Sequence, residues 1–101
     1  MELVPQAVRE RLPPLYSQED EDDPLLICKF FTPDSGWTWY AYEFDGDDLF
    51  FGWVVGLEKE LGYFRLSELL SIRGPFGLPI ERDLHFVPTR LSVVETWHVS
   101  G

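Results

Sequence analysis

The chain has 101 residues, of which 45% are hydrophobic, so it has the length of one domain and enough apolar material for a core. Its single cysteine, Cys28, excludes an internal disulfide framework and a multi-cysteine zinc site. No apolar run approaches the roughly 18 residues of a membrane span, and the N-terminus lacks a secretory signal. We therefore expect a single cytoplasmic domain over residues 1–101 that binds no membrane.

The net charge of −10 is concentrated in one third of the chain. Residues 19–48 hold ten acidic residues and one base, Lys29, which gives a net charge of −9. Such a segment repels phosphate backbones, so we expect no direct nucleic-acid binding and a basic protein surface as the partner. The alternative is that these acidic residues form solvated loops that only keep the protein soluble.

The N-terminal residues predict a short helix. Pro5 suits a first helical turn, Val4, Val8 and Leu12 recur at every fourth residue, and Pro13-Pro14 ends the pattern. The acidic run Glu19-Asp20-Glu21-Asp22-Asp23 predicts a loop, because like charges repel and the following proline disfavours helical angles.

Three strands are predicted next, over residues 25–31, 37–44 and 49–57. They are rich in aromatic and aliphatic residues and are separated by the turn formers of 32–36 and 45–48. Short turns between consecutive strands indicate an antiparallel meander.

The remaining residues are less regular. A fourth strand is predicted over 62–66, after the charged turn Glu58-Lys59-Glu60, and Ser67 is then a candidate N-cap for one or two helical turns. Further on, the pattern predicts irregular structure over 75–79, a brief strand or turn over 81–86, and either a helix or a strand over 91–99. The whole sequence predicts an α+β fold, a small antiparallel β-meander of three to four strands with short flanking helices.

Both faces of the second predicted strand are aromatic. Strict alternation places Trp37, Trp39, Ala41 and Glu43 on one face, and Thr38, Tyr40, Tyr42 and Phe44 on the other. This is more apolar surface than one covered face requires. Either short helices cover both faces, or some aromatic side chains remain available to a partner.

The sequence offers little for catalysis. Cys28 lies in an apolar run, where a thiol behaves as a small hydrophobic group, and neither histidine belongs to a nucleophile motif. Asp45, Asp47 and Asp48 crowd one turn, and such oxygen ligands suit calcium or magnesium, but Gly46 comes too early for an EF-hand. A polar hairpin tip is the simpler interpretation, so we expect no metal, no cofactor and no enzyme.

Several segments resemble a bacterial family of small acidic proteins of unknown function, often encoded on plasmids and integrative elements. The resemblance rests on Leu12-Pro-Pro-Leu-Tyr-Ser-Gln-Glu-Asp20, Lys29-Phe-Phe-Thr-Pro-Asp34, Trp37-Thr-Trp-Tyr40, Glu43-Phe-Asp-Gly46, Glu60-Leu-Gly-Tyr-Phe64 and Leu78-Pro-Ile-Glu-Arg-Asp83. It covers roughly residues 8–90 and implies a mobile-element context, but it brings no catalytic residues.

Charge and resemblance together predict a protein-interaction module of a mobile element. One version inhibits a host defence nuclease, of a CRISPR or restriction system, by presenting a nucleic-acid-like acidic surface. The expected partner-binding residues are Glu19, Asp20, Glu21, Asp22, Asp23, Asp34, Trp37, Trp39, Tyr40, Tyr42, Glu43, Asp45, Asp47 and Asp48. Two alternatives stay open: single-stranded nucleic-acid binding by an aromatic sheet, and a metal-dependent enzyme that uses the turn at 45–48.

Overall fold

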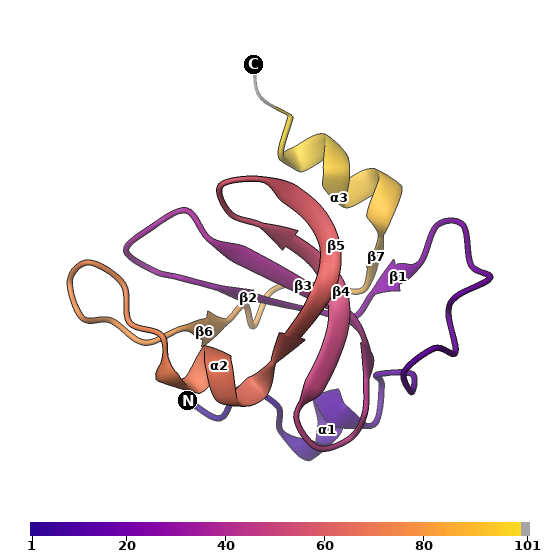
Figure 1. Ribbon diagram of the computed structural model, residues 1–101, viewed down its shortest axis with the longest axis horizontal. Helices are drawn as coiled ribbons and strands as arrows, with labels where there is room; N and C mark the ends of the chain where they lie inside the picture. The colour runs from indigo at the N-terminus through magenta and orange to yellow at the C-terminus, as the bar shows by residue number, and fades with distance from the viewer. Residues whose placement is uncertain (100–101) are drawn as a thin grey trace.

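A five-stranded antiparallel sheet forms the centre of the computed structural model, which describes residues 1–99 (Figure 1). Its strands, in the spatial order β5-β4-β3-β2-β6, are β5 (Lys59–Arg65), β4 (Leu49–Val55), β3 (Thr38–Phe44), β2 (Cys28–Phe31) and β6 (Glu81–Arg82). A separate two-stranded sheet pairs β1 (Leu25–Leu26) with β7 (Thr89–Arg90). The antiparallel sheet and the mixture of helix and strand are confirmed, whereas the predicted number of three to four strands is too low.

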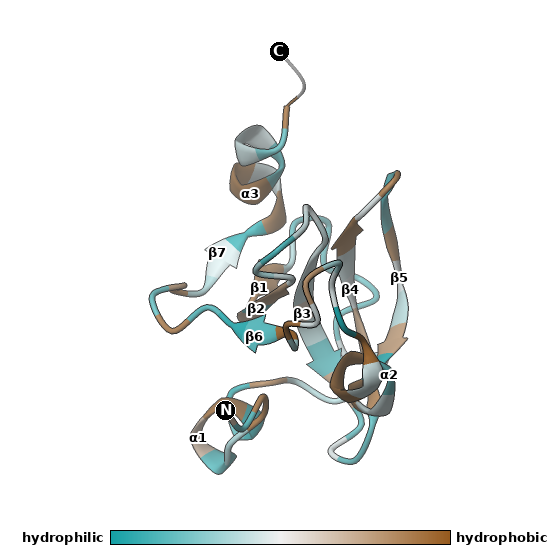
Figure 2. Cartoon of the chain, turned by 90° about the vertical axis from the view of Figure 1, so that its left-hand side faces the viewer, coloured by the Kyte–Doolittle hydropathy of each residue, from teal (hydrophilic) through white to brown (hydrophobic). Residues whose placement is uncertain are grey.

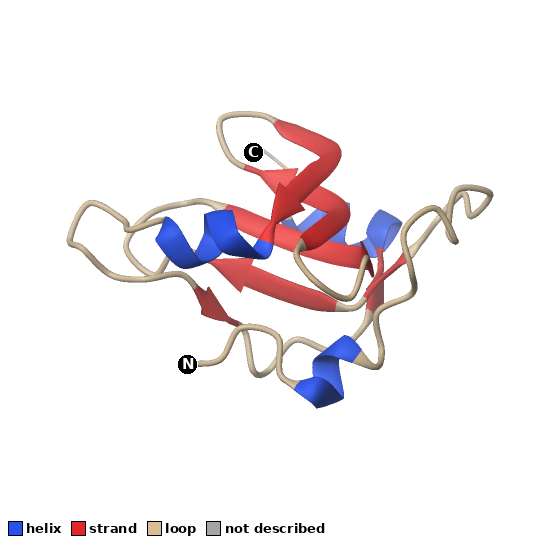
Figure 3. Cartoon of the chain, turned by 60° about the horizontal axis from the view of Figure 1, so that its bottom comes forward, coloured by secondary structure: helices blue, strands red, loops and turns tan. Residues whose placement is uncertain are grey.

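Three short helices accompany the sheet: α1 (Gln6–Arg9), α2 (Leu66–Ser71) and α3 (Leu91–Trp97). In the view of Figure 2, α3 lies above the strands and α1 lies below them. The segment between α1 and β1, which contains the acidic run, has no helix or strand, as predicted, and extends away from the sheet (Figure 3).

The first face of the sheet, which we call the phenylalanine face, is a packed aromatic core. Its ring stack joins three strands, with centroid distances of 4.3 Å for Phe44–Phe50 and 5.1 Å for Phe50–Phe64. The N-terminal segment, α2 and the residue before β6 cover this stack with a set of buried aliphatic side chains: Leu3, Val4, Val8, Leu12, Leu69 and Ile80. These elements are too short to be stable alone, so burial against the sheet holds them in place.

The opposite face, which we call the tyrosine face, is covered by other parts of the chain. Tyr40, Tyr42 and Trp53 pack there with Leu26 of β1 and Val94 of α3. Both sheet faces therefore carry a core, which is the first of the two arrangements that the aromatic pattern allowed. Coverage of the tyrosine face stops short of β5, where Leu61 and Tyr63 are 49% and 53% exposed.

Several element boundaries differ from the prediction. β5 begins at Lys59 rather than residue 62, because an edge strand accepts charged side chains that a central strand does not. α2 begins at Leu66 with Arg65 as its N-cap, so the assignment of Ser67 as the cap is wrong. The segment 91–99, for which the sequence allowed a helix or a strand, forms the helix α3 over Leu91–Trp97, and β7 precedes it.

Candidate partner-binding site

A bulge in β3 changes which side chains face which core. The β3–β4 register pairs Ala41 with Gly52 and Glu43 with Phe51, so Tyr42 is an extra residue on β3. Past the bulge the alternation shifts by one, and Phe44 joins the phenylalanine face. The strict alternation predicted from the sequence is therefore wrong here, because Glu43 accompanies Tyr42 instead of Trp39.

Glu43 is a buried carboxylate, only 4% exposed. Its Oε1 accepts a hydrogen bond from the backbone N–H of Tyr16 at 3.0 Å, and its Oε2 accepts one from the N–H of Gln18 at 2.8 Å. Within residues 1–99, the ion pairs are Lys29–Asp83 and Arg65–Asp48, so Glu43 has no cationic partner there. Glu43 thus holds the backbone just before the acidic run of residues 19–23, and its own buried carboxylate has no counter-charge in the described residues.

Tyr16 is the residue at which the chain turns toward Glu43. Its φ of 68° lies in the left-handed region, which is strained for an aromatic residue. The hydrogen bond from its backbone N–H to Glu43 compensates for part of this strain. The backbone here is held by one carboxylate, and the acidic run follows directly after it.

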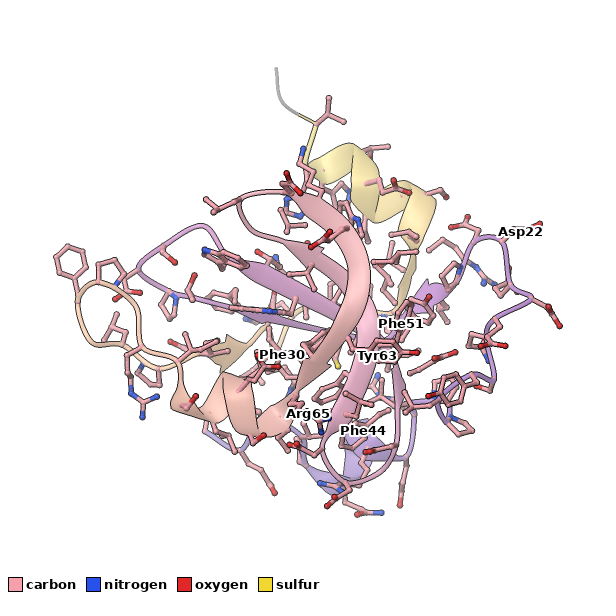
Figure 4. The ribbon with its side chains drawn as sticks, viewed as in Figure 1. Asp22, Phe30, Phe44, Phe51, Tyr63 and Arg65 are labelled. Carbon is pink, nitrogen blue, oxygen red and sulfur yellow. The ribbon has the colours of Figure 1, made fainter. Side chains whose placement is uncertain are left out.

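A hollow of about 420 Å³ lies between this segment and the tyrosine face. Its aromatic walls come from three adjacent strands. The ring centroids of Tyr42 and Phe51 are 5.5 Å apart in an edge-on arrangement, and those of Phe51 and Tyr63 are 4.7 Å apart. Figure 4 shows Phe51 and Tyr63 on neighbouring strands, with Asp22 out on the loop beyond them. The full lining is Tyr16, Gln18, Glu19, Glu21, Asp22, Pro24, Tyr42, Glu43, Phe51, Leu61, Tyr63 and Leu91.

The hollow has a negative electrostatic environment. Burial raises the pKa of the Tyr42 hydroxyl above its usual value, and the charge of Glu43 raises it further. Desolvation likewise raises the pKa of Tyr63, with added contributions from the neighbouring Tyr16 and from the charges of Glu43 and Glu19. Both phenols therefore stay protonated at neutral pH and present neutral rings to any occupant.

The structure brings together five of the residues predicted to bind a partner: Glu19, Glu21, Asp22, Tyr42 and Glu43 all line this hollow. Asp20 is exposed on the same loop. Tyr16, Leu61 and Tyr63 also line the hollow but are not among the predicted residues, although Leu61 and Tyr63 alternate along β5. Their role depends on the true start of that strand.

Asp23 has a structural role at the end of the acidic run. Its carboxylate accepts hydrogen bonds from the N–H and hydroxyl of Ser92, at 2.9 and 2.6 Å, and so caps the start of α3. These bonds hold the pKa of Asp23 below its usual value.

The hairpin at 45–48 is likewise organised from within. Asp45 accepts hydrogen bonds from the backbone N–H groups of Asp47, Asp48 and Leu49. Asp48 accepts bonds from the N–H and hydroxyl of Ser67 and pairs with Arg65, which ties the turn to α2. No acidic residue of this hairpin lines the hollow, so the two acidic regions do not form one site.

The remaining predicted residues lie elsewhere. Tyr40 is fully buried and Trp39 is 6% exposed, so both are core side chains, whereas Trp37 is 39% exposed and stacks on Trp39. Asp34 accepts a hydrogen bond from the N–H of Phe76 and holds the loop after α2 against the β2–β3 turn. None of these residues lines the hollow.

Within residues 1–99, no three His, Cys, Asp or Glu side chains gather in a way that could hold a metal ion. In that part of the chain, no helix is long and apolar enough to cross a membrane.

The molecule is a small α+β protein whose antiparallel sheet is packed on both faces, with an acidic, aromatic-walled hollow at one side. Residues 3–97 match the family model described as a protein of unknown function, DUF2958, and the chain belongs to that family. No curated protein and no solved structure matches the chain.

Proposed function

We propose that this protein is a binding module that recognises a basic protein surface through the loop of Glu19, Asp20, Glu21 and Asp22 and the hollow beside it. The observation that carries the proposal is the lack of internal neutralisation: all four loop residues are exposed, and within residues 1–99 none forms an ion pair. The carboxylates of Asp23, Asp45 and Asp48 act in caps and turns. In the loop, Glu21 accepts one backbone bond, from the N–H of Asp23 at 3.2 Å, but the four charges are balanced by no ion pair in the described residues.

The loop is also anchored, which distinguishes it from a solvated tail. Glu43 holds its start through Tyr16 and Gln18, and Asp23 holds its end against α3. A fixed array of charges loses less conformational entropy on binding than a mobile one, so it suits recognition. A basic partner would be attracted over long range, and the adjacent aromatic side chains would add desolvated contacts.

The kind of partner follows from the sequence resemblance. A mobile-element protein benefits from binding a host defence nuclease, whose nucleic-acid channel is lined with Lys and Arg. We propose this as the version to test first, with the acidic loop competing against the nucleic acid for the channel. In this version the protein is a cytoplasmic inhibitor and not an enzyme.

Single-stranded nucleic-acid binding is less well supported by the packing. Base stacking requires accessible ring faces, whereas Trp39, Tyr40, Tyr42 and Trp53 are each at most 6% exposed. Phe51 lies beside the acidic loop, which adds repulsion from the phosphates.

The test begins with capture of the partner from the native host and crosslinking mass spectrometry to map the contact. The association rate of the purified pair is then measured for a loop variant carrying E19Q, D20N, E21Q and D22N. The matched control carries E2Q, E58Q, E60Q and E95Q, four exposed acidic residues outside the hollow. It has the same change in net charge.

We expect the loop variant to associate about tenfold more slowly at low salt and to lose most of its dependence on ionic strength, because charge steering sets the rate. The control should stay close to the wild type. Equal losses in both variants would assign the effect to net charge and contradict a loop-specific site. A partner without a basic contact surface would contradict the proposal itself.

A further inference from the structure

The hollow beside the acidic loop contains a buried carboxylate whose charge nothing in the described chain balances. Buried charges in proteins are normally paired, yet Glu43 is 4% exposed and receives only backbone N–H groups. Each of its oxygens can accept a further hydrogen bond. The imbalance at Glu43 points to a cation supplied from outside the chain.

The basic side chains Lys29 of β2, Arg65 of β5 and Arg90 of β7 make other contacts. Lys29 pairs with Asp83 and lies over the ring of Tyr40, and Arg65 pairs with Asp48. Arg90 donates to the carbonyl oxygen of Asp23. None of these three lines the hollow.

The walls of the hollow suit an organic cation. Phe51 and Tyr63 lie on adjacent strands in direct register, and Glu43 lies opposite Phe51 on the third strand. This register aligns a carboxylate and two rings across the tyrosine face. A cation placed against such rings gains cation–π attraction in addition to its attraction to the carboxylate.

We infer that this hollow binds the guanidinium group of a single arginine side chain presented by the basic partner. The inference rests on the proposed function, since it names the group of the partner that enters the hollow. The volume of about 420 Å³ is at the small end of ligand pockets, which run from roughly 300 to 1,000 Å³, and accommodates one side chain.

Arginine fits better than lysine for two reasons. The guanidinium plane stacks on aromatic rings and is weakly hydrated, whereas an ammonium holds its water strongly. Its N–H groups form a fork that matches the two oxygens of a carboxylate such as Glu43. Glu19 and Glu21, at the rim, add attraction without geometric constraint.

The experiment titrates the isotope-labelled protein with N-acetyl-arginine-N-methylamide and follows the amide resonances by NMR. The amides of Tyr16 and Gln18 report directly, because both donate to Glu43. We expect saturable shifts at these two amides and at Phe51 and Tyr63. The neutral citrulline derivative should give no shifts. The lysine derivative should bind at least about threefold more weakly than the arginine derivative.

Two variants test the site, each with a matched control. Glu43→Gln removes the charge and should weaken arginine binding about tenfold, while Glu58→Gln makes the same change at an exposed position outside the hollow. Tyr63→Leu removes one ring and should weaken binding about threefold, while Phe76→Leu removes an 84% exposed ring elsewhere. Because Tyr63 is half exposed, its variant remains informative if Glu43→Gln fails to fold.

Shifts confined to the exposed loop, equal shifts with citrulline, or lysine binding as strong as arginine would each overturn the inference. So would a Tyr63→Leu variant that binds like Phe76→Leu. If the arginine derivative fails while the loop variant of the full complex still loses association, the binding module stands and only the arginine pocket is wrong. If both fail, the proposed function is wrong as well.

Discussion

The two faces of the sheet use aromatic residues in different ways. On the phenylalanine face the rings of Phe44, Phe50 and Phe64 carry no polar atoms, lie in a continuous stack and are closed off by aliphatic side chains. On the tyrosine face the rings carry hydroxyl groups, a carboxylate lies among them, and one end stays open as the hollow. The first face therefore secures the fold, while the second combines a smaller core with the surface that we propose binds a partner.

The largest difference between the faces should appear on truncation of single rings. Phe50→Ala removes the central ring of the stack, which is fully buried, and should lower the free energy of unfolding by about 3–5 kcal/mol. Tyr63→Ala, on the open end of the tyrosine face, should cost less than about 1 kcal/mol. Urea denaturation of both variants measures the difference, and similar losses would remove the distinction between the faces.

A smaller effect is expected from the carboxylate on the tyrosine face. Glu43→Ala leaves the N–H groups of Tyr16 and Gln18 without their acceptor, and should cost about 1–3 kcal/mol. Hydrogen exchange at these two amides should accelerate more than the global stability change explains. Unchanged exchange there would show that Glu43 does not hold the acidic loop.

The strands were largely predictable from the sequence because their signals are local. Three runs rich in aromatic and aliphatic residues contain β2, β3 and β4. The turns at 32–36 and 45–48, which hold Pro33 and Asp45-Gly46, separate these runs. β5 was placed too late, because Glu58-Lys59-Glu60 has the composition of a turn and only its edge position permits Lys59 and Glu60 in a strand. Ser67 does not cap α2: it donates its N–H and hydroxyl to Asp48 of a distant turn, while Glu68 accepts the N–H of the N-cap residue Arg65.

The site was only partly predictable, because it depends on tertiary contacts. The acidic run indicated the loop correctly, but nothing in the sequence separated Asp23, a cap, from its exposed neighbours. The aromatic residues of the second predicted strand are candidates for partner binding by residue type alone, and most of them are buried in the core. The bulge at Tyr42 leaves no local signature, so the position of Glu43 beside Tyr42 could not be derived from alternation.

The smallest expected difference concerns pH. On the tyrosine face, a hydrogen bond of 2.7 Å joins the hydroxyl of Tyr40 to Nε2 of His98. Burial lowers the pKa of His98 below 6.5, and the positive charges of Lys29 and Lys59 lower it further. The unfolded chain therefore binds a proton more readily than the folded one, so stability should be full above about pH 6.5 and fall as the pH drops below it. Urea midpoints at pH 7.5 and 5.5 measure the loss, which His98→Gln should reduce.

The phenylalanine face provides the contrast. Burial raises the pKa of the Cys28 thiol to about 12, so this thiol stays protonated over the same pH range. A thiol reagent at pH 8 should modify Cys28 only after unfolding. Rapid modification of the native protein would mean that this face opens as readily as the other.

The bulge in β3 gives this strand one residue more than its ladder with β4 needs. Deleting Tyr42 would leave a regular ladder in which Ala41 still pairs with Gly52, Glu43 with Phe51 and Phe44 with Phe50, so every later residue would keep its face. If Tyr42 stayed and the bulge were lost, Glu43 would instead come opposite Phe50, among the stacked phenylalanine rings. The extra residue therefore sets which side chains of β3 face each core, and an insertion or deletion outside the bulge should be more damaging than the loss of Tyr42.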